Sequence, residues 1–194
     1  MKIIGLTGQT GAGKSTVAAW LRAHGTVCID ADRVSRAVTE PGTAALKEVI
    51  AAFGKEMLSA DGTLNRRALG SLVFADEAKR KQLESILFPH IIADIRRQLE
   101  KAEKNGAAVA VLDAPTLFES GLDKICTRTV GVVADENRRY ERIVSRDGLT
   151  ADAAKARMNA QKSEAFFRTH CDEVIENNGD WEALEKRIRE VFDL

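Results

Sequence analysis

The sequence has little of what marks secreted, metal-binding or membrane proteins. Its three cysteines lie far apart, and no two of them form a C-x-x-C spacing. An odd, dispersed set of cysteines does not indicate a disulfide framework, so we expect reduced thiols in a cytoplasmic protein. The three histidines are equally dispersed and do not form the pattern of a metal centre.

Net charge and long apolar segments are absent as well. Lys plus Arg and Asp plus Glu each number 29, so the formal net charge is zero and gives no general attraction to nucleic acid or anionic membranes. No apolar run is long enough to span a bilayer, and the first residues lack the apolar core of a signal peptide. We expect no nucleic-acid or membrane partner, and a monomer or a weak homo-oligomer.

Five short apolar runs, each bounded by turn-forming residues, indicate buried strands. They lie at residues 3–6, 27–29, 109–112, 130–133 and 174–175. Such continuous hydrophobicity is typical of parallel strands that are covered on both faces. Because helical patterns lie between the runs, the sequence predicts an α/β fold with a five-stranded parallel sheet flanked by helices.

The long gap between the second and third expected strands has helical patterns instead. Apolar residues recur there at helical spacing, as in Leu46, Val49, Ile50 and Phe53. We predict a nucleotide-binding core at 1–40 and 106–194, with a helical lid at about 136–165. Residues 41–105 would form an all-helical insertion at the carboxyl edge of the sheet, where a second substrate can bind.

Residues 8–15 read GQTGAGKS and match the phosphate-loop pattern G-x-x-x-x-G-K-[ST] between an expected strand and an expected helix. Glycines let the backbone approach the phosphates closely, and the loop N–H groups then face these anions. Lys14 would reach the β- and γ-phosphate oxygens of ATP, and the Ser15 hydroxyl would bind Mg²⁺. The predicted nucleotide-binding residues are Gly8, Thr10, Gly11, Ala12, Gly13, Lys14, Ser15 and Thr16.

Acidic residues follow two of the expected strands. Asp30 and Asp32 come directly after the second strand, and either carboxylate can accept a proton from an attacking hydroxyl or only cap the next helix. Asp32 is the better candidate for the base, and Asp30 for the cap. Asp113 ends the third strand, where it can hold Mg²⁺ through water or only start a turn; we favour the metal role.

Arg138, Arg142 and Arg146 recur every four residues on a helix expected after the fourth strand. This cationic face could close over ATP as a lid and stabilise charge on the transferred phosphoryl group. The same pattern is typical of a solvated helix face whose arginines pair with neighbouring acidic residues. The spacing alone does not decide between these two interpretations.

Several segments together resemble the dephospho-CoA kinase family over nearly the whole chain. They are IGLTGQTGAGKST at 4–16, DADRVSR at 30–36, DGTLNRRAL at 61–69, LDAPTLFESG at 112–121 and DEVIENNG at 172–179. The phosphate loop is generic, whereas the DAD and PTLFE segments are much more specific. The resemblance implies a P-loop NTPase fold and transfer of the ATP γ-phosphoryl group to the 3′-hydroxyl of dephospho-CoA, the last step of coenzyme A synthesis.

The resemblance also implies roles for individual residues. Lys14, Asp32, Arg142 and Arg146 would be catalytic, with Asp32 as the base for the 3′-hydroxyl. The two arginines would belong to the lid. Asn177, after the last expected strand, would lie near the adenine of ATP.

For the acceptor, the resemblance implies contacts from Asp32, Arg36 and Arg66. The chain departs from the family here, since it has Phe88 and Asn65 where family members often have His and Asp. A nucleoside monophosphate kinase or another small-molecule kinase would share the loop, the base and the lid. A GTPase would need an N-K-x-D or T-K-x-D motif, and no Asn or Thr in this chain precedes a Lys.

Overall fold

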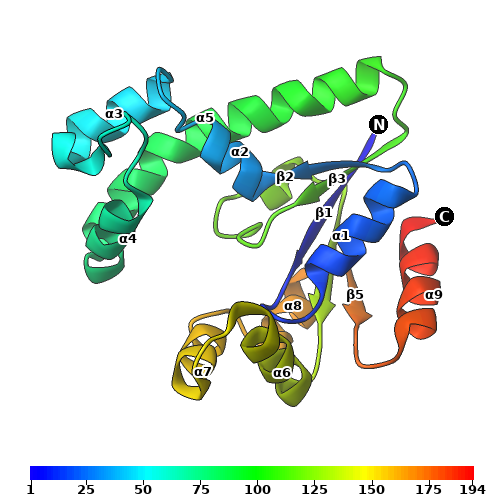
Figure 1. Cartoon of the computed structure of the whole chain (residues 1–194). Coiled ribbons are helices and arrows are strands. Elements are labelled where there is room, and N and C mark those ends of the chain that lie inside the picture. Colours follow the sequence, from blue (N-terminus) through cyan, green and yellow to red (C-terminus); the bar gives the residue numbers. More distant parts are fainter. The chain divides into compact units, whose positions relative to one another are not determined.

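The computed structural model describes residues 1–194 and contains a sheet of five strands. The strands are β1 (Lys2–Gly8), β2 (Val27–Asp30), β3 (Val109–Asp113), β4 (Arg128–Val133) and β5 (Glu173–Glu176). Their order is β2-β3-β1-β4-β5, and β1 pairs in parallel with both β3 and β4. The predicted five-stranded parallel sheet is confirmed, with one strand at each apolar run (Figure 1).

Helices fill the segments between the strands, and none of them combines the length and hydropathy that crossing a membrane requires. The α-helices are α1 (Lys14–Ala23), α2 (Ala31–Ala37), α3 (Ala44–Phe53), α4 (Arg66–Ala75), α5 (Glu77–Lys104), α6 (Glu136–Asp147), α7 (Ala151–Asn159), α8 (Glu164–His170) and α9 (Trp181–Phe192). Two short 3₁₀ helices are η1 (Lys55–Met57) and η2 (Leu122–Ile125).

The chain divides into two compact units. We call Met1–Cys28 with Gly106–Leu194 the loop unit, and Ile29–Asn105 the helical unit. The helical unit begins before the predicted boundary at residue 41, because α2 contacts α5 within it.

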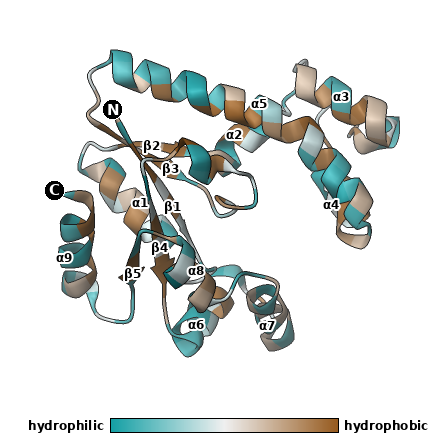
Figure 2. Cartoon of the chain, turned by 180° about the vertical axis from the view of Figure 1, so that it is seen from behind, coloured by the Kyte–Doolittle hydropathy of each residue, from teal (hydrophilic) through white to brown (hydrophobic).

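The core of the loop unit explains the apolar strands. Leu6 and Val130 on the strands are fully buried against Leu21 of α1 and Ile188 of α9. Burial of each such side chain contributes about 1.5–3 kcal/mol to folding. Figure 2 shows this pattern as brown along the strands, with brown and teal residues mixed along α1 and α9.

The helical unit has a core of its own. Leu46, Val49 and Phe53 of α3, whose spacing predicted a helix here, are buried together with Leu69 of α4. Helix α5 runs for 28 residues with Pro89 inside it, although proline removes a backbone hydrogen bond from a helix interior. The predicted helical insertion is therefore organised around one long helix.

Candidate active site

The phosphate loop connects the end of β1 to the start of α1, and its glycines are required by close contacts. A Cβ atom on Gly8 would collide with the main-chain carbonyl oxygen of Val132. Gly11 has φ +76°, and a Cβ atom there would lie 2.6 Å from the carbonyl oxygen of Arg139. Any other residue at these two positions would push the loop away from β4 and α6.

Two side chains hold the carbonyl groups of the loop. Arg142 Nη1 donates to the carbonyl oxygens of Gly11 and Ala12 at 3.3 and 3.4 Å, and its Nη2 donates to the carbonyl of Asn177 at 3.1 Å. The Asn177 side-chain amide, 7% exposed, donates to Ala12 at 2.8 Å. These bonds satisfy the Gly11 and Ala12 carbonyl groups and hold the backbone of the loop in one conformation.

Asp113 joins the loop to the sheet through ion pairs. Asp113 lies at the end of β3 and is 6% exposed, and its carboxylate accepts a hydrogen bond from Lys14 Nζ. Its second oxygen lies 3.4 Å from Arg22 Nη2. Two cations therefore compensate one buried carboxylate, as a buried charge requires.

Few residues near the loop can hold a metal ion. The structure contains no group of three or more His, Cys, Asp or Glu side chains arranged for one. Ser15 and Asp113 offer one hydroxyl and one carboxylate. This donor set fits Mg²⁺, which binds few protein oxygens and takes its other ligands from water and nucleotide phosphates.

A cavity of about 470 Å³ lies beside the loop in the loop unit. It is lined by Gly11, Gly13, Ser15, Thr16, Glu141, Arg142, Ser145 and Arg146. Arg146 donates to both oxygens of Asp147, at 2.7 and 2.8 Å, and these bonds hold the pKa of the Asp147 carboxyl below its ordinary value. The cavity thus combines loop amides with two guanidinium groups, which suits a polyphosphate.

In the helical unit, Asp30 is the last residue of β2 and Asp32 lies in α2. The Asp30 side chain accepts from the N–H of Arg33 at 3.0 Å and caps the helix, as predicted for this residue. Asp32 lies in the first turn and is exposed, as is Arg36 one turn later. Arg66 Nη2 donates to Thr39 Oγ1 at 2.7 Å and to the Arg36 carbonyl at 3.2 Å, so Arg66 fixes the end of α2.

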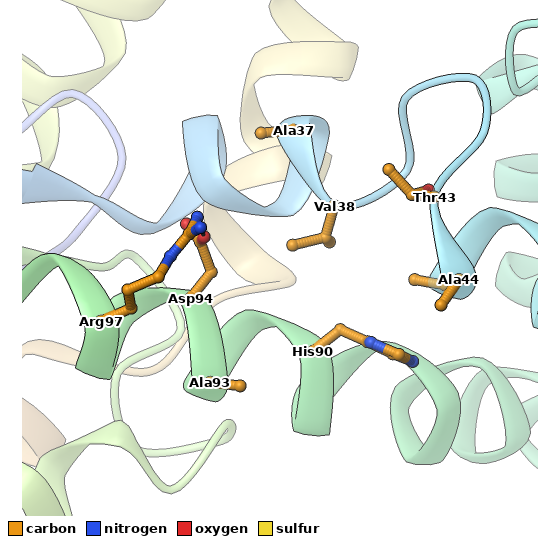
Figure 3. A pocket seen from close by; sticks show the side chains of 9 residues that line it. Ala37, Val38, Thr43, Ala44, His90, Ala93, Asp94 and Arg97 are labelled. Atoms are coloured by element: carbon orange, nitrogen blue, oxygen red, sulfur yellow. Dashed lines mark hydrogen bonds and ion pairs between the residues drawn. The ribbon is translucent and has the colours of Figure 1, made fainter.

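The helical unit has a second cavity, of about 430 Å³. Figure 3 shows Ala37 and Val38 on one side of it and His90, Ala93 and Arg97 of α5 on the other. The His90 ring lies 3.1 Å from a carboxylate oxygen of Glu48. Most of the lining is small and apolar, with charged groups at its rim.

Comparison with known proteins identifies the family. A family model described as dephospho-CoA kinase matches residues 2–183. The chain belongs to the dephospho-CoA kinase family. The dephospho-CoA kinase of Shouchella clausii is 40% identical to it over 190 residues, which cover 98% of this chain and 95% of that protein.

Solved structures agree with the family. A crystal structure of a Thermus thermophilus protein is 35% identical, with a TM-score of 0.85 over 99% of this chain and 96% of that one. Dephospho-CoA kinase from Campylobacter jejuni is 25% identical, with a TM-score of 0.73 over 100% and 96%. The interpretation of this sequence as a dephospho-CoA kinase is confirmed over another small-molecule kinase.

The predicted site residues of this family member fall into two groups. The loop residues, Asp113, Arg142, Arg146 and Asn177 all belong to the loop unit. Asp32, Arg36 and Arg66 belong to the helical unit. Asn177, predicted near adenine, bonds to the loop itself. Arg142, predicted as a lid arginine, bonds to loop carbonyls.

Two residues that contact the loop received no role from the sequence. Arg139, 7% exposed, donates from Nε to the Thr10 carbonyl at 3.0 Å. Gln161 Oε1 accepts from the Thr10 N–H at 2.6 Å. A signal existed for Arg139, since it lies four residues before the fully buried Ile143 and therefore on the inner face of α6.

Proposed function

We propose that this chain binds Mg²⁺-ATP in the cavity beside the phosphate loop and transfers the γ-phosphoryl group to the ribose 3′-hydroxyl of dephospho-CoA. The products are coenzyme A and ADP. The observation that carries the proposal is the cavity beside the loop, which is lined by loop residues Gly11, Gly13, Ser15 and Thr16 together with Arg142 and Arg146 of α6. Dianionic phosphates need such a concentration of donors in a site that excludes water.

On the nucleotide side, Lys14 leaves Asp113 and binds the β- and γ-phosphate oxygens. Ser15, and Asp113 through water, would hold Mg²⁺, which would neutralise charge on the phosphates. Arg142 keeps the loop in shape through the Gly11 and Ala12 carbonyls. Arg146 exchanges its partner Asp147 for the γ-phosphoryl oxygens and stabilises charge on them.

On the acceptor side, Asp32 takes the proton of the 3′-hydroxyl. The freed oxygen forms a bond to the γ-phosphorus, the bond from that phosphorus to the β–γ bridging oxygen breaks, and ADP leaves. Asp32 is exposed in the first turn of α2. Asp30 caps the start of this helix and Arg66 bonds to Thr39 just after its end, so both ends are held in place. A base held on a rigid helix keeps its direction between turnovers.

We assign the pantetheine arm of the acceptor to the cavity of the helical unit. Its small apolar lining fits the methyl groups of the arm, and Thr43 and His90 supply groups that can bond to its amides. Arg36 is exposed on the same face of α2 as Asp32 and would bind the acceptor diphosphate. The protein would act in the cytoplasm as a monomer or a weak homo-oligomer.

A direct assay tests the acceptor. The purified chain is incubated with Mg²⁺-ATP and, in parallel, dephospho-CoA, adenosine or AMP, and ADP release is followed. We expect ADP with dephospho-CoA only, together with a product that a coenzyme A-dependent enzyme accepts. ADP release with AMP or adenosine, and none with dephospho-CoA, would overturn the proposal.

A further inference from the structure

Arg139 is a buried cation that the proposed reaction does not use. It lies on α6, next to Arg138, which is exposed. Its guanidinium donates to neutral acceptors of the loop, and burial lowers the pKa of Arg139, while Glu136 and Glu164 act to raise it. An arginine remains charged after such a shift, so a full cation lies behind the phosphate loop.

Both main-chain polar groups of Thr10 are bonded to the lid. Its carbonyl accepts from Arg139 Nε at 3.0 Å, and its N–H donates to Gln161 Oε1 at 2.6 Å. Arg139 belongs to α6, whereas Gln161 lies between α7 and α8. The orientation of this one residue is therefore set by two separate parts of the lid.

The contacts extend to the preceding residue. With its carboxamide oxygen facing these donors, Gln9 accepts from Arg139 Nη1 at 2.7 Å and from the N–H of Glu164, the first residue of α8, at 3.2 Å. Gln9 is itself buried. The planar guanidinium thus bonds two adjacent loop residues at once, which a lysine ammonium at the end of a flexible chain cannot reproduce.

We propose that Arg139 and Gln161 form a positioning pair that couples the lid to the phosphate loop. The pair holds the first half of the loop, so that the N–H groups from Gly11 onward point at the nucleotide only while α6 and the α7–α8 connection are docked. This inference rests on the proposed function only in that the loop binds ATP, and it does not depend on the acceptor. Neither residue touches the reacting atoms.

A double-mutant cycle on nucleotide binding tests the pair. We would measure the Kd of Mg²⁺-ATP by calorimetry, without acceptor, for Arg139→Gln, Arg139→Lys, Gln161→Ala and the double variant Arg139→Gln/Gln161→Ala, with melting temperatures recorded alongside. Because a lost hydrogen bond to a charged group costs more than a neutral one, we expect Kd to rise about tenfold for Arg139→Gln and about threefold for Gln161→Ala. Arg139→Lys should fall between wild type and Arg139→Gln.

The coupling between the two substitutions, together with a control variant, distinguishes a positioning role of the pair from a packing role. Since both residues hold Thr10, the double variant should lose clearly less affinity than the product of the two single losses. Lys155→Gln removes one positive charge from the exposed surface of α7 and should leave Kd unchanged. Should Arg139→Gln fail to fold, the cycle is run with Arg139→Lys.

Two results would overturn the proposed positioning pair. In the first, the single variants melt at a lower temperature but keep the Kd of Mg²⁺-ATP within twofold of wild type. In the second, the rise in Kd of the double variant equals the product of the rises in the two single variants. A wild-type chain that binds no ATP would instead contradict the proposed function. The two failures are therefore distinguishable.

Discussion

The loop unit and the helical unit place their polar side chains differently. In the loop unit, Asp113, Arg139 and Asn177 are each at most 7% exposed, and each bonds to the phosphate loop or its lysine. In the helical unit, Asp32 and Arg36 lie exposed on a short helix. Buried polar groups must be fully bonded within the protein and therefore hold a single geometry, whereas exposed groups can also bond to water.

This difference indicates a division of labour. The loop unit fixes the backbone of its phosphate loop before a nucleotide arrives, which avoids the cost of ordering that backbone on binding. The helical unit fixes both ends of α2 and leaves Asp32 and Arg36 exposed on it. Substitutions in the loop unit should therefore damage nucleotide binding, and those in the helical unit should damage acceptor turnover alone.

The largest effect should come from Lys14→Ala. Loss of the ammonium removes a direct contact to the transferred phosphoryl group, and we expect kcat to fall about a thousandfold, with weaker ATP binding. Rates of ADP release and calorimetry measure the two effects. Lys155→Ala, which changes an exposed lysine of α7, should behave as wild type. Retained turnover in Lys14→Ala would contradict the role of the loop.

Asp32→Asn tests the other half of the comparison. Loss of the base should lower kcat about a hundredfold or more, while the Kd of ATP stays within twofold. Steady-state kinetics with dephospho-CoA and calorimetry with ATP measure the two quantities. Asp152→Asn changes an exposed aspartate in the first turn of α7 and serves as the control. If Asp32→Asn weakens ATP binding as strongly as it lowers turnover, the division between the units is wrong.

A smaller effect is expected for Arg66→Gln. Removing the bonds to Thr39 and the Arg36 carbonyl loosens the end of α2, and we expect the KM for dephospho-CoA to rise about fivefold, the equivalent of one hydrogen bond. The KM for ATP should not change. Arg67→Gln, exposed on the same helix, provides the matched control. Equal rises in both KM values would show that Arg66 acts beyond its own unit.

The smallest effect concerns stability of the loop unit at low pH. The Asp172 carboxylate accepts from the Thr129 N–H and hydroxyl at 2.7 and 2.8 Å, and these bonds hold the pKa of Asp172 below its ordinary value. A lowered folded-state pKa stabilises the protein above the unfolded value, and this contribution is lost as pH falls through the folded one. Melting temperatures between pH 6 and 3 should therefore fall less steeply in Asp172→Asn. An unchanged slope would contradict the assignment.

The sequence predicted the parts that follow from local rules. The apolar runs predicted all five strands, because strands buried on both faces have no polar alternation. The phosphate loop followed from its motif, and the Asp30 cap from its position before a helix. Each of these depends on residues that are neighbours in the chain.

The rest depends on contacts between distant segments. Gln161 reaches Thr10 across 151 positions, and no pattern near either residue indicates it. The bonds of Arg66 to the Arg36 carbonyl and to Thr39 join positions 30 and 27 residues apart, and no local pattern indicates them either. The membership of α2 in the helical unit likewise follows from its packing on α5, which the spacing of α2 alone does not encode.

The most direct test of this account is a crystal structure with Mg²⁺ and a non-hydrolysable ATP analogue. We expect the phosphates on the N–H groups of residues 11–16, with Lys14 moved from Asp113 to the β- and γ-phosphate oxygens. The Arg142 and Asn177 bonds to the loop carbonyls should be unchanged. Nucleotide bound elsewhere, or a loop that rearranges to receive it, would contradict the claim that the loop unit is organised in advance for phosphate.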